Sequence, residues 1–153
     1  MRVTAKVDYA VRAAIVLAEA YEEGKPTKGE RIATAQGIPS KYLENILSEL
    51  RQSAIVRSQR GADGGYWLQR SPAEVSIADI IRAVEGPLAN VRGEPPEMLV
   101  YPEGTGSLQD AWIATRAALR NVLEHVTLAD LRTGSLPKDI RPLLDEDGAW
   151  SVR

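Results

Sequence analysis

The segment that most constrains the fold spans residues 27–68, where signals for two short helices precede two strand-like runs. Thr27 and Glu30 have the spacing of a capping box, which satisfies unpaired backbone N–H groups at a helix start. Gly37 can take the left-handed conformation that ends a helix, and the residue before Pro39 is disfavoured in the helical region. The segment therefore predicts a helix, a tight turn and a second helix.

The second helix, with Ser40 as its cap, is predicted to have one apolar and one polar face. The apolar residues recur at helical spacing and must pack inward; they are Leu43, Ile46, Leu47 and Leu50. The opposite face carries Lys41, Glu44, Asn45 and Ser48, with Tyr42 at its edge. In a DNA major groove Asn can pair with adenine and Glu can accept from cytosine. Because any surface helix is polar outside, this row alone does not establish a DNA contact.

Two β-prone runs follow, at residues 54–59 and 65–69, and the short segment between them supplies the glycines that a hairpin tip needs. A helix-turn-helix followed by a two-stranded ribbon is the winged variant of this DNA-binding motif. Arg60 beside Gly61 suits a narrow minor groove, where the negative potential is enhanced and bulk is excluded. The ribbon therefore strengthens the DNA-binding interpretation of the helix before it.

Four segments also carry a family resemblance. They are Met-Arg-x-Thr at the start with Tyr-Ala-Val at 9–11, Ser-x-Tyr-Leu-Glu at 40–44, Arg-Gly-x-x-Gly-Gly-Tyr at 60–66, and Asp-Ile-Ile-Arg-Ala-Val-Glu-Gly at 79–86. In this order, from residue 1 to residue 86, they resemble the Rrf-two family of bacterial repressors, which includes IscR, NsrR and CymR. The resemblance implies a DNA-binding repressor whose recognition helix contains 40–44 and whose wing contains 60–66.

The predicted DNA contacts combine this resemblance with helical position. They are Thr4, Lys6, Ser40, Lys41, Tyr42, Glu44, Asn45, Arg51, Arg60, Gly61, Gly64 and Gly65. We expect Ser40 and Tyr42 to hold the recognition helix on the DNA backbone, and Lys41, Glu44 and Asn45 to face base edges. Arg51, Thr4 and Lys6 are candidates for phosphate contacts, and the three glycines shape the wing tip. The resemblance supports Ser40, Tyr42, Glu44, Arg60 and Gly61; the others rest on position.

Composition fits a small, mainly α protein with an aliphatic core. Hydrophobic residues make up 44% of the 153, yet aromatic residues are 5% and Phe is absent. The net charge of −2 hides a division: residues 1–70 carry 11 basic and 8 acidic side chains, and residues 71–153 carry 8 and 13. A basic first half and an acidic second half fit a DNA-contacting module joined to one that stays off DNA.

Several chemistries are excluded or disfavoured by the residue types present. The chain has no cysteine, which excludes disulfides and thiolate metal sites, and His125, its single histidine, cannot form a zinc site alone. No nucleophile elbow accompanies that histidine, and the wing glycines lack the strand-to-helix context of a phosphate loop. We therefore predict no enzyme, no metal and no cofactor. Without a signal peptide or an apolar run of about 20 residues, a cytoplasmic protein is expected.

The family resemblance bears on iron as well. Many Rrf-two members hold an iron–sulfur cluster with three cysteines in the loop that corresponds to residues 88–106, with a first-helix acidic or His residue sometimes completing the site. Here that loop offers Glu94, Glu97 and Glu103, and Asp8 occupies the comparable place in the first helix. Because such clusters are held chiefly by Cys, no cluster is expected.

The longest helix is predicted to begin at Ser107, capped together with Asp110, and to mediate dimerisation. Its apolar stripe consists of Leu108, Trp112, Thr115, Leu119, Val122 and Val126. Ile113 and neighbouring alanines add a second apolar flank, and a helix apolar on two sides needs two partners. A second copy of the chain is the economical partner, because helix-turn-helix proteins usually dimerise to read a palindromic site. The alternative is a helix buried within its own subunit.

Four regions result: a winged helix-turn-helix domain (1–86), an effector or sensor loop (87–106), a dimerisation helix region (107–134) and a C-terminal tail (135–153) with an unexplained Trp150. The sequence looks closest to the cysteine-free, CymR-like branch of the family, which implies a homodimeric repressor of sulfur or cysteine metabolism with a small-molecule or protein effector. Two alternatives remain: a winged helix used as a protein-interaction module, and a cluster- or ligand-dependent stress sensor of the same family.

Overall fold

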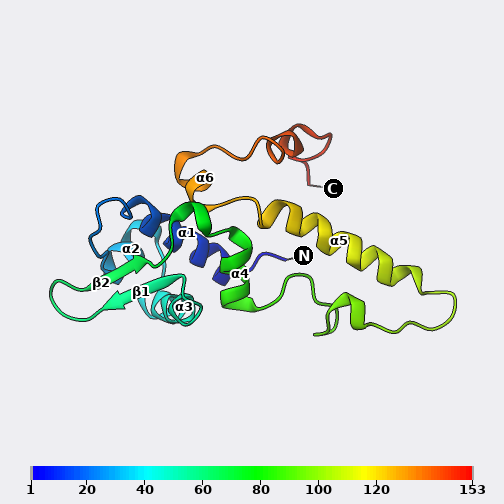
Figure 1. Ribbon diagram of the computed structural model, residues 1–153, viewed down its shortest axis with the longest axis horizontal. Helices are drawn as coiled ribbons and strands as arrows, with labels where there is room; N and C mark the ends of the chain where they lie inside the picture. The colour runs from blue at the N-terminus through cyan, green and yellow to red at the C-terminus, as the bar shows by residue number, and fades with distance from the viewer. Residues whose placement is uncertain (1, 153) are drawn as a thin grey trace.

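The computed structural model describes residues 2–152 as a helical body from which one long helix projects (Figure 1). The helices are α1 (Ala5–Glu19), α2 (Gly29–Gln36), α3 (Ser40–Gln52), α4 (Ile77–Glu85), α5 (Ser107–Leu123) and α6 (Leu128–Thr133). The strands are β1 (Val56–Gln59) and β2 (Gly65–Leu68), and short 3-10 turns are η1 (Pro72–Glu74), η2 (Pro96–Met98) and η3 (Arg141–Asp145). The predicted mainly α fold with a small β-wing is confirmed.

Helix α1 lies at the centre of the body, where it packs against α2, α3, α4 and α6. Four alanines on α1 are fully buried, and their small side chains let neighbouring helices approach closely; they are Ala10, Ala13, Ala14 and Ala18. Leu17 is buried with them, whereas Val11 and Ile15 are half-buried. The core around α1 is aliphatic, as the composition predicted.

Three predicted helix caps are wrong. Helix α2 begins at Gly29 without a side-chain cap, because Thr27 stays extended and its backbone N–H and C=O pair with those of Tyr66, both at 2.9 Å. Ser40 and Ser107 are the first residues of α3 and α5 rather than their caps, which are Pro39 and Gly106.

The wing is an antiparallel pair in which Val56 lies opposite Leu68 and Gln59 opposite Gly65. Both strands are shorter than predicted. Ala54 has a positive φ of 55° and belongs to the turn that follows α3, so the chain becomes extended only after this turn. The bridge between Thr27 and Tyr66 extends the pairing toward α2, which attaches the root of the wing to the helix-turn-helix.

The second half of the chain returns to the body at α4 and α6. Two capping boxes, Ser76 with Asp79 and Thr127 with Asp130, begin these helices, and a β-bridge joins Ser76 to Thr127. Between them α5 projects outward, with no buried residue along its length. Val126, predicted in the apolar stripe of this helix, lies beyond its end and is 2% exposed. Its carbonyl accepts from the Ile77 N–H, so Val126 belongs to the subunit's own core.

The loop before α5 is ordered along that helix. The Gln109 side-chain amide donates to the carbonyls of Pro96 and Leu99 at 3.1 and 3.0 Å, and the Trp112 indole N–H donates to the Tyr101 hydroxyl at 3.1 Å. Beyond α6 the C-terminal segment was expected to be an unstructured tail. Part of it is structured instead, since it includes η3 and a buried Ile140. Within residues 2–152 no helix is long and apolar enough to cross a bilayer.

Candidate nucleic-acid interface

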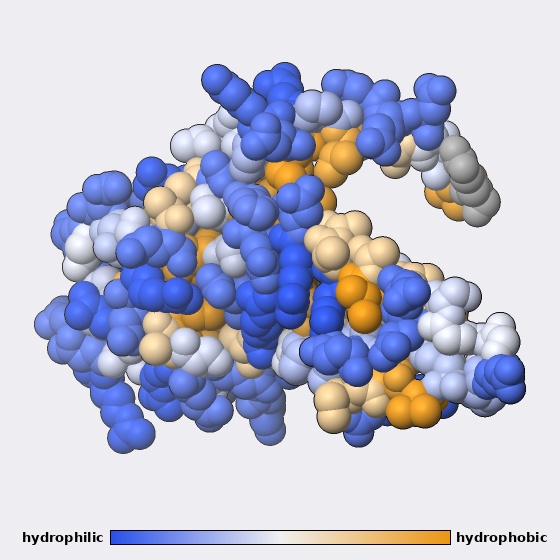
Figure 2. All heavy atoms as spheres, turned by 45° about the vertical axis from the view of Figure 1, so that its right-hand side comes forward, coloured by the Kyte–Doolittle hydropathy of each residue, from blue (hydrophilic) through white to orange (hydrophobic). Residues whose placement is uncertain are grey.

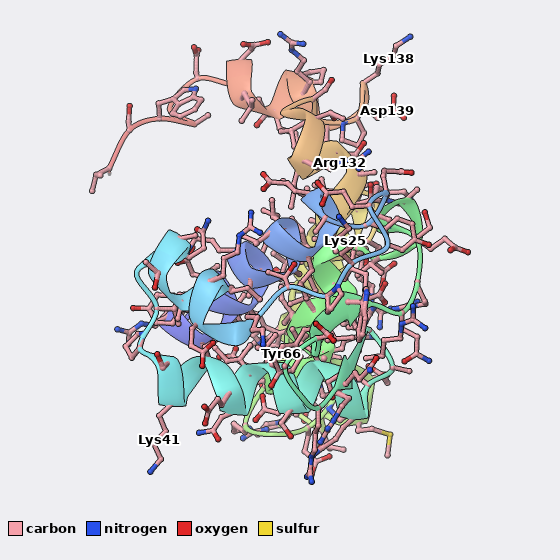
Figure 3. All side chains as sticks on the ribbon, turned by 90° about the vertical axis from the view of Figure 1, so that its left-hand side faces the viewer. Lys25, Lys41, Tyr66, Arg132, Lys138 and Asp139 are labelled. Carbon is pink, nitrogen blue, oxygen red and sulfur yellow. The ribbon has the colours of Figure 1, made fainter. Side chains whose placement is uncertain are left out.

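Helix α3 is held by its apolar face and leaves its polar face exposed. Leu43, Ile46, Leu47 and Leu50 are buried, as predicted, while Lys41, Glu44 and Asn45 are exposed. Within residues 2–152 none of these three polar side chains takes part in a hydrogen bond or ion pair. Figure 3 shows Lys41 projecting from α3 away from the protein body. The row predicted to face base edges is therefore free to meet an external ligand.

Tyr42 is positioned by residues of α1 that the sequence analysis did not select. Its ring stands edge-on to Tyr9, with centroids 5.8 Å apart and an angle of 82° between planes. The Arg12 guanidinium lies 4.9 Å from the Tyr9 centroid and donates to the Gln36 carbonyl at 3.1 Å. Such edge-to-face and cation–π contacts restrict ring orientation. These contacts hold the start of α3 against α1 and α2.

The wing tip presents Arg60 to solvent. In the part of the chain that the structure describes, Arg60 is exposed and forms no hydrogen bond or ion pair. Beside it Gly61 has a φ of 105° and open space where a Cβ would lie. This bare, cationic tip has the properties needed to enter a narrow minor groove.

Gly64 and Gly65 have a structural role in the wing, and they do not form its contact surface. A Cβ on Gly64 would lie 2.2 Å from the Gln59 carbonyl oxygen, and one on Gly65 would lie 2.7 Å from the Thr27 carbonyl oxygen. Both approaches are closer than real side chains allow. These glycines are therefore required for the hairpin to close and for its root to pair with Thr27.

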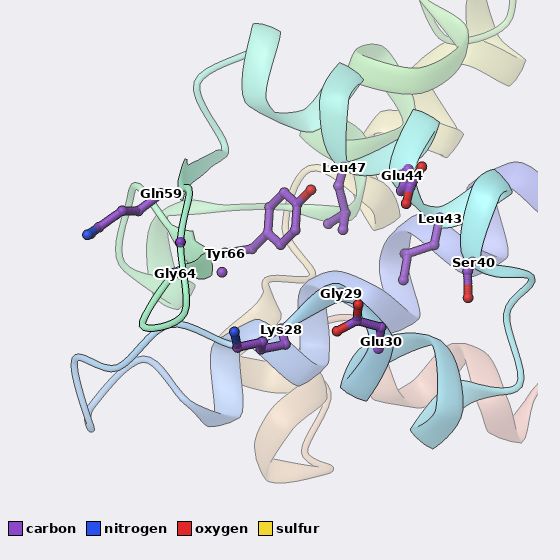
Figure 4. A pocket seen from close by; sticks show the side chains of 12 residues that line it. Lys28, Gly29, Glu30, Ser40, Leu43, Glu44, Leu47, Gln59, Gly64 and Tyr66 are labelled. Atoms are coloured by element: carbon purple, nitrogen blue, oxygen red, sulfur yellow. The ribbon is translucent and has the colours of Figure 1, made fainter.

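A groove of about 260 Å³ separates the wing from α2 and α3 (Figure 4). Its polar lining includes Glu30 from α2, Ser40 and Glu44 from α3, and Gln59 from the wing. Lys28, also in the lining, crosses from the start of α2 to the tip, where its Nζ donates to the Ala62 carbonyl at 2.5 Å. Lys28 was not predicted as a site residue, because only the tertiary structure brings it to the wing.

Two further arginines lie next to the wing, one at the end of α3 and one on β1. Arg51, a predicted phosphate contact, donates to the Ser58 hydroxyl at 3.2 Å and remains exposed. Arg57, which the sequence analysis missed, lies 5.1 Å from the Trp67 ring centroid. The Trp67 indole N–H donates to the Gly24 carbonyl at 3.2 Å. Arg51 is thus held at the end of α3 and Arg57 against the second strand of the wing.

The structure turns two predicted phosphate contacts inward. The Thr4 hydroxyl caps α1 by accepting from the Val7 N–H at 3.3 Å and donates to the Glu85 carboxylate. The Lys6 ammonium donates to the Glu49 carboxylate at 2.9 Å and to the Val84 carbonyl at 2.8 Å. These contacts occupy both side chains within the subunit, because the ends of α3 and α4 meet at the start of α1.

The comparisons with known proteins agree with this geometry. Residues 3–134 match the Rrf2 family, described as an iron-dependent transcriptional regulator. The chain belongs to the Rrf2 family. It is 47% identical, over 95% of its length and 90% of the relative, to Rv1287 of Mycobacterium tuberculosis strain ATCC 25618 / H37Rv, named as a helix-turn-helix (HTH)-type transcriptional regulator. It is 37% identical to CymR of Bacillus subtilis strain 168 over 86% of this chain and 89% of CymR.

Solved structures of Rrf2 proteins share the fold. CymR, the global cysteine regulator of B. subtilis, matches with a TM-score of 0.75 and 33% identity over 88% of this chain and 98% of the CymR chain. IscR of T. potens matches with a TM-score of 0.71 and 32% identity over 88% of each chain. This Rrf2 protein is a DNA-binding transcriptional regulator.

The iron dependence in the family description does not fit the donor residues of this member. The chain has no cysteine, and residues 2–152 bring together no group of three His, Asp or Glu side chains able to hold a metal ion. In the loop, the Glu97 carboxylate forms an ion pair with Arg116 at 2.6 Å. A hydrogen bond from the Glu97 backbone N–H and the Arg116 guanidinium hold the pKa of this carboxyl below its ordinary value. Glu97 is therefore a structural partner of α5.

Proposed function

We propose that this Rrf2 protein is a homodimeric repressor that covers a palindromic operator, with α3 in the major groove and the wing in the adjacent minor groove. The observation that carries the proposal is the unpaired polar row of Lys41, Glu44 and Asn45 on α3, together with Arg60 at the wing tip. Ser40 and Tyr42 would hold the helix on the DNA backbone, and Arg51 and Arg57 would contact phosphates. Chromosomal DNA as the ligand supports a cytoplasmic location.

Dimerisation through α5 is part of the proposal. The 17-residue amphipathic helix α5 has no buried residue, and its own subunit covers its apolar stripe only in part, leaving Trp112, Leu119 and Val122 half-buried. The stripe now comprises Leu108, Trp112, Thr115, Leu119 and Val122, since Val126 is buried within the subunit. A dimer would present two recognition helices to half-sites about 34–36 Å apart, one turn of DNA.

The signal is proposed to be a small molecule or a protein acting at residues 87–106 rather than an iron–sulfur cluster. Support comes from the absence of thiolate donors and from the likeness to CymR, the global cysteine regulator of B. subtilis. On that likeness we propose genes of sulfur or cysteine metabolism as targets.

The direct test measures binding of the full chain to DNA from its own upstream region at low and moderate salt. Because phosphate contacts release counterions, affinity should fall on the order of a thousandfold between about 50 and 200 mM salt if six or more phosphates are contacted. Weak, salt-insensitive binding to every DNA tested would favour a protein-interaction module. An anaerobic absorption spectrum on the same sample tests for a cluster, and a brown protein would contradict the cluster-free proposal.

A further inference from the structure

The C-terminal arm, defined as residues 135–152, carries an exposed apolar patch. The Trp150 indole N–H donates to the Leu144 carbonyl at 2.7 Å, which folds the indole back onto the η3 turn. Leu143, Leu144 and Trp150 are nevertheless 38%, 39% and 82% exposed. Three large apolar side chains on one short segment form a surface that a partner would cover.

The root of the arm is attached to the body, while the patch stands away from it. Arg132 of α6 donates to the Ala18 carbonyl at 3.4 Å, and Ile140 is 5% exposed. Beyond this root, the space-filling view shows a hollow between the arm and the part of the molecule that contains α5 (Figure 2). The arm and α5 therefore lie on opposite sides of an opening in one subunit.

Helix α5 offers only a small face to a second copy. At about 1.5 Å per residue, its 17 residues make a rod about 25 Å long and about 10 Å wide, which presents roughly 250 Å² on one face. A specific interface usually buries about 800 Å² on each partner. A second apolar surface on the same side of the subunit would enlarge this interface, and the apolar patch of the arm is available.

We propose that the C-terminal arm of each copy closes over α5 of the second copy. In this arrangement, the partner's helix fills the hollow, so that Leu143, Leu144 and Trp150 cover apolar residues such as Ile113. Charge is complementary, because the arm carries Asp145 and Glu146, while Arg120 of α5 forms only a long ion pair of 3.8 Å with Glu124 and stays half exposed. The inference rests on the proposed homodimer. It adds a clasp, meaning the contact between the arm of one copy and α5 of the other, which the pairing of two α5 helices does not require.

The first test compares the dimer dissociation constants of the wild type and of Leu143→Ser/Leu144→Ser by sedimentation. Loss of two leucines from a buried interface should raise the constant at least about tenfold. Far-ultraviolet circular dichroism of the variant should match the wild type, because both leucines are partly exposed in the subunit and its helices do not depend on them. An unchanged dissociation constant would overturn the proposal.

The second test identifies which copy the arm contacts, and it uses the absence of native cysteine. Chains carrying only Leu144→Cys are mixed with chains carrying only Ile113→Cys and oxidised gently. A disulfide between the two chains, located by peptide mass spectrometry, is expected. The matched control replaces Ile113→Cys with Ala62→Cys, an exposed position on the wing, and should give no such product.

A chain that carries both Leu144→Cys and Ile113→Cys distinguishes a contact within one chain from a contact between two chains. If the 144–113 bond forms within one chain in dilute protein and not between mixed chains, the arm closes on its own helix and the proposal is wrong. A monomer at all concentrations would contradict the proposed homodimer itself. A stable dimer whose affinity is unaffected by the arm variant would remove the clasp and leave the proposed function intact.

Discussion

Glu44 and Arg60 are predicted to contribute differently to DNA binding. Glu44 lies in the exposed polar row of α3, where a carboxylate can accept from cytosine in the major groove. We expect Glu44→Ala to relax sequence preference with a small loss of affinity. Arg60→Ala should weaken binding by about 1–3 kcal/mol, mostly on sites with A·T-rich flanks. Binding to a panel of operator variants measures both effects, and an unchanged preference in Glu44→Ala would contradict its role as a base reader.

Lys28 is predicted to act through Arg60. Its ammonium holds the Ala62 carbonyl, so its loss should free the wing tip and reduce what Arg60 contributes. In a double-mutant cycle on DNA affinity, Lys28→Met should cost about 1 kcal/mol alone and much less in an Arg60→Ala background. Lys28→Arg, which keeps the charge and a donor, is the control. Additive losses would instead indicate an independent phosphate contact.

At the scale of single elements, the wing depends on the absence of a side chain at Gly64. Because a Cβ there would lie 2.2 Å from the Gln59 carbonyl oxygen, we expect Gly64→Ala to lower the free energy of unfolding by about 1–3 kcal/mol. DNA affinity should fall as well. Gly106→Ala is a matched control, since Gly106 has a φ of −60° and open space around it. Equal melting temperatures for the two variants would contradict this account of the hairpin.

The junction between the loop and α5 should weaken in acid. The lowered pKa of Glu97 means that the folded state favours the charged carboxylate. The larger cause is the hydrogen bond from the Glu97 backbone N–H, and the second is the Arg116 side chain. Its contribution is therefore fully present above the unfolded value of about 4.5 and is lost as pH falls through the lower folded pKa. The difference in melting temperature between wild type and Glu97→Gln should vanish in strong acid and be constant near neutrality. A difference that grows in acid would contradict the sign.

At the scale of the whole molecule, α4 lies between the DNA-binding face and α5. Lys6 connects Glu49 of α3 to the Val84 carbonyl of α4, and Arg82 of α4 forms an ion pair with Glu124 at the end of α5. The interface proposed for DNA and the helix proposed for dimerisation are therefore joined by direct contacts.

The proposed assembly predicts a particle of twice the 16.7 kDa chain mass in solution. The reason is the 17-residue helix α5, which has no buried residue in the isolated subunit. Sedimentation equilibrium at micromolar protein checks the mass, and Leu119→Asp on the α5 stripe should shift the mass toward the monomer. A wild-type chain that stays monomeric would contradict assembly through α5.

Local sequence determined the features that depend on neighbours within one or two helical turns. The capping boxes of Ser76 with Asp79 and of Thr127 with Asp130 are such features, because each involves residues only three positions apart. The buried face of α3 was also predicted correctly, because its apolar residues recur at the spacing of one helical face. The family motifs indicated the winged helix-turn-helix, and the family match confirmed it.

Only the tertiary structure decided the features that depend on distant partners. Thr27 lost its predicted cap because Tyr66 supplies backbone hydrogen bonds, and Thr4 and Lys6 turn inward because Glu85 and Glu49 lie beside them. Lys28 reaches the wing for the same reason. A local pattern records which side chains are available, whereas packing of remote elements determines which of them find partners inside the subunit and which remain free to bind DNA.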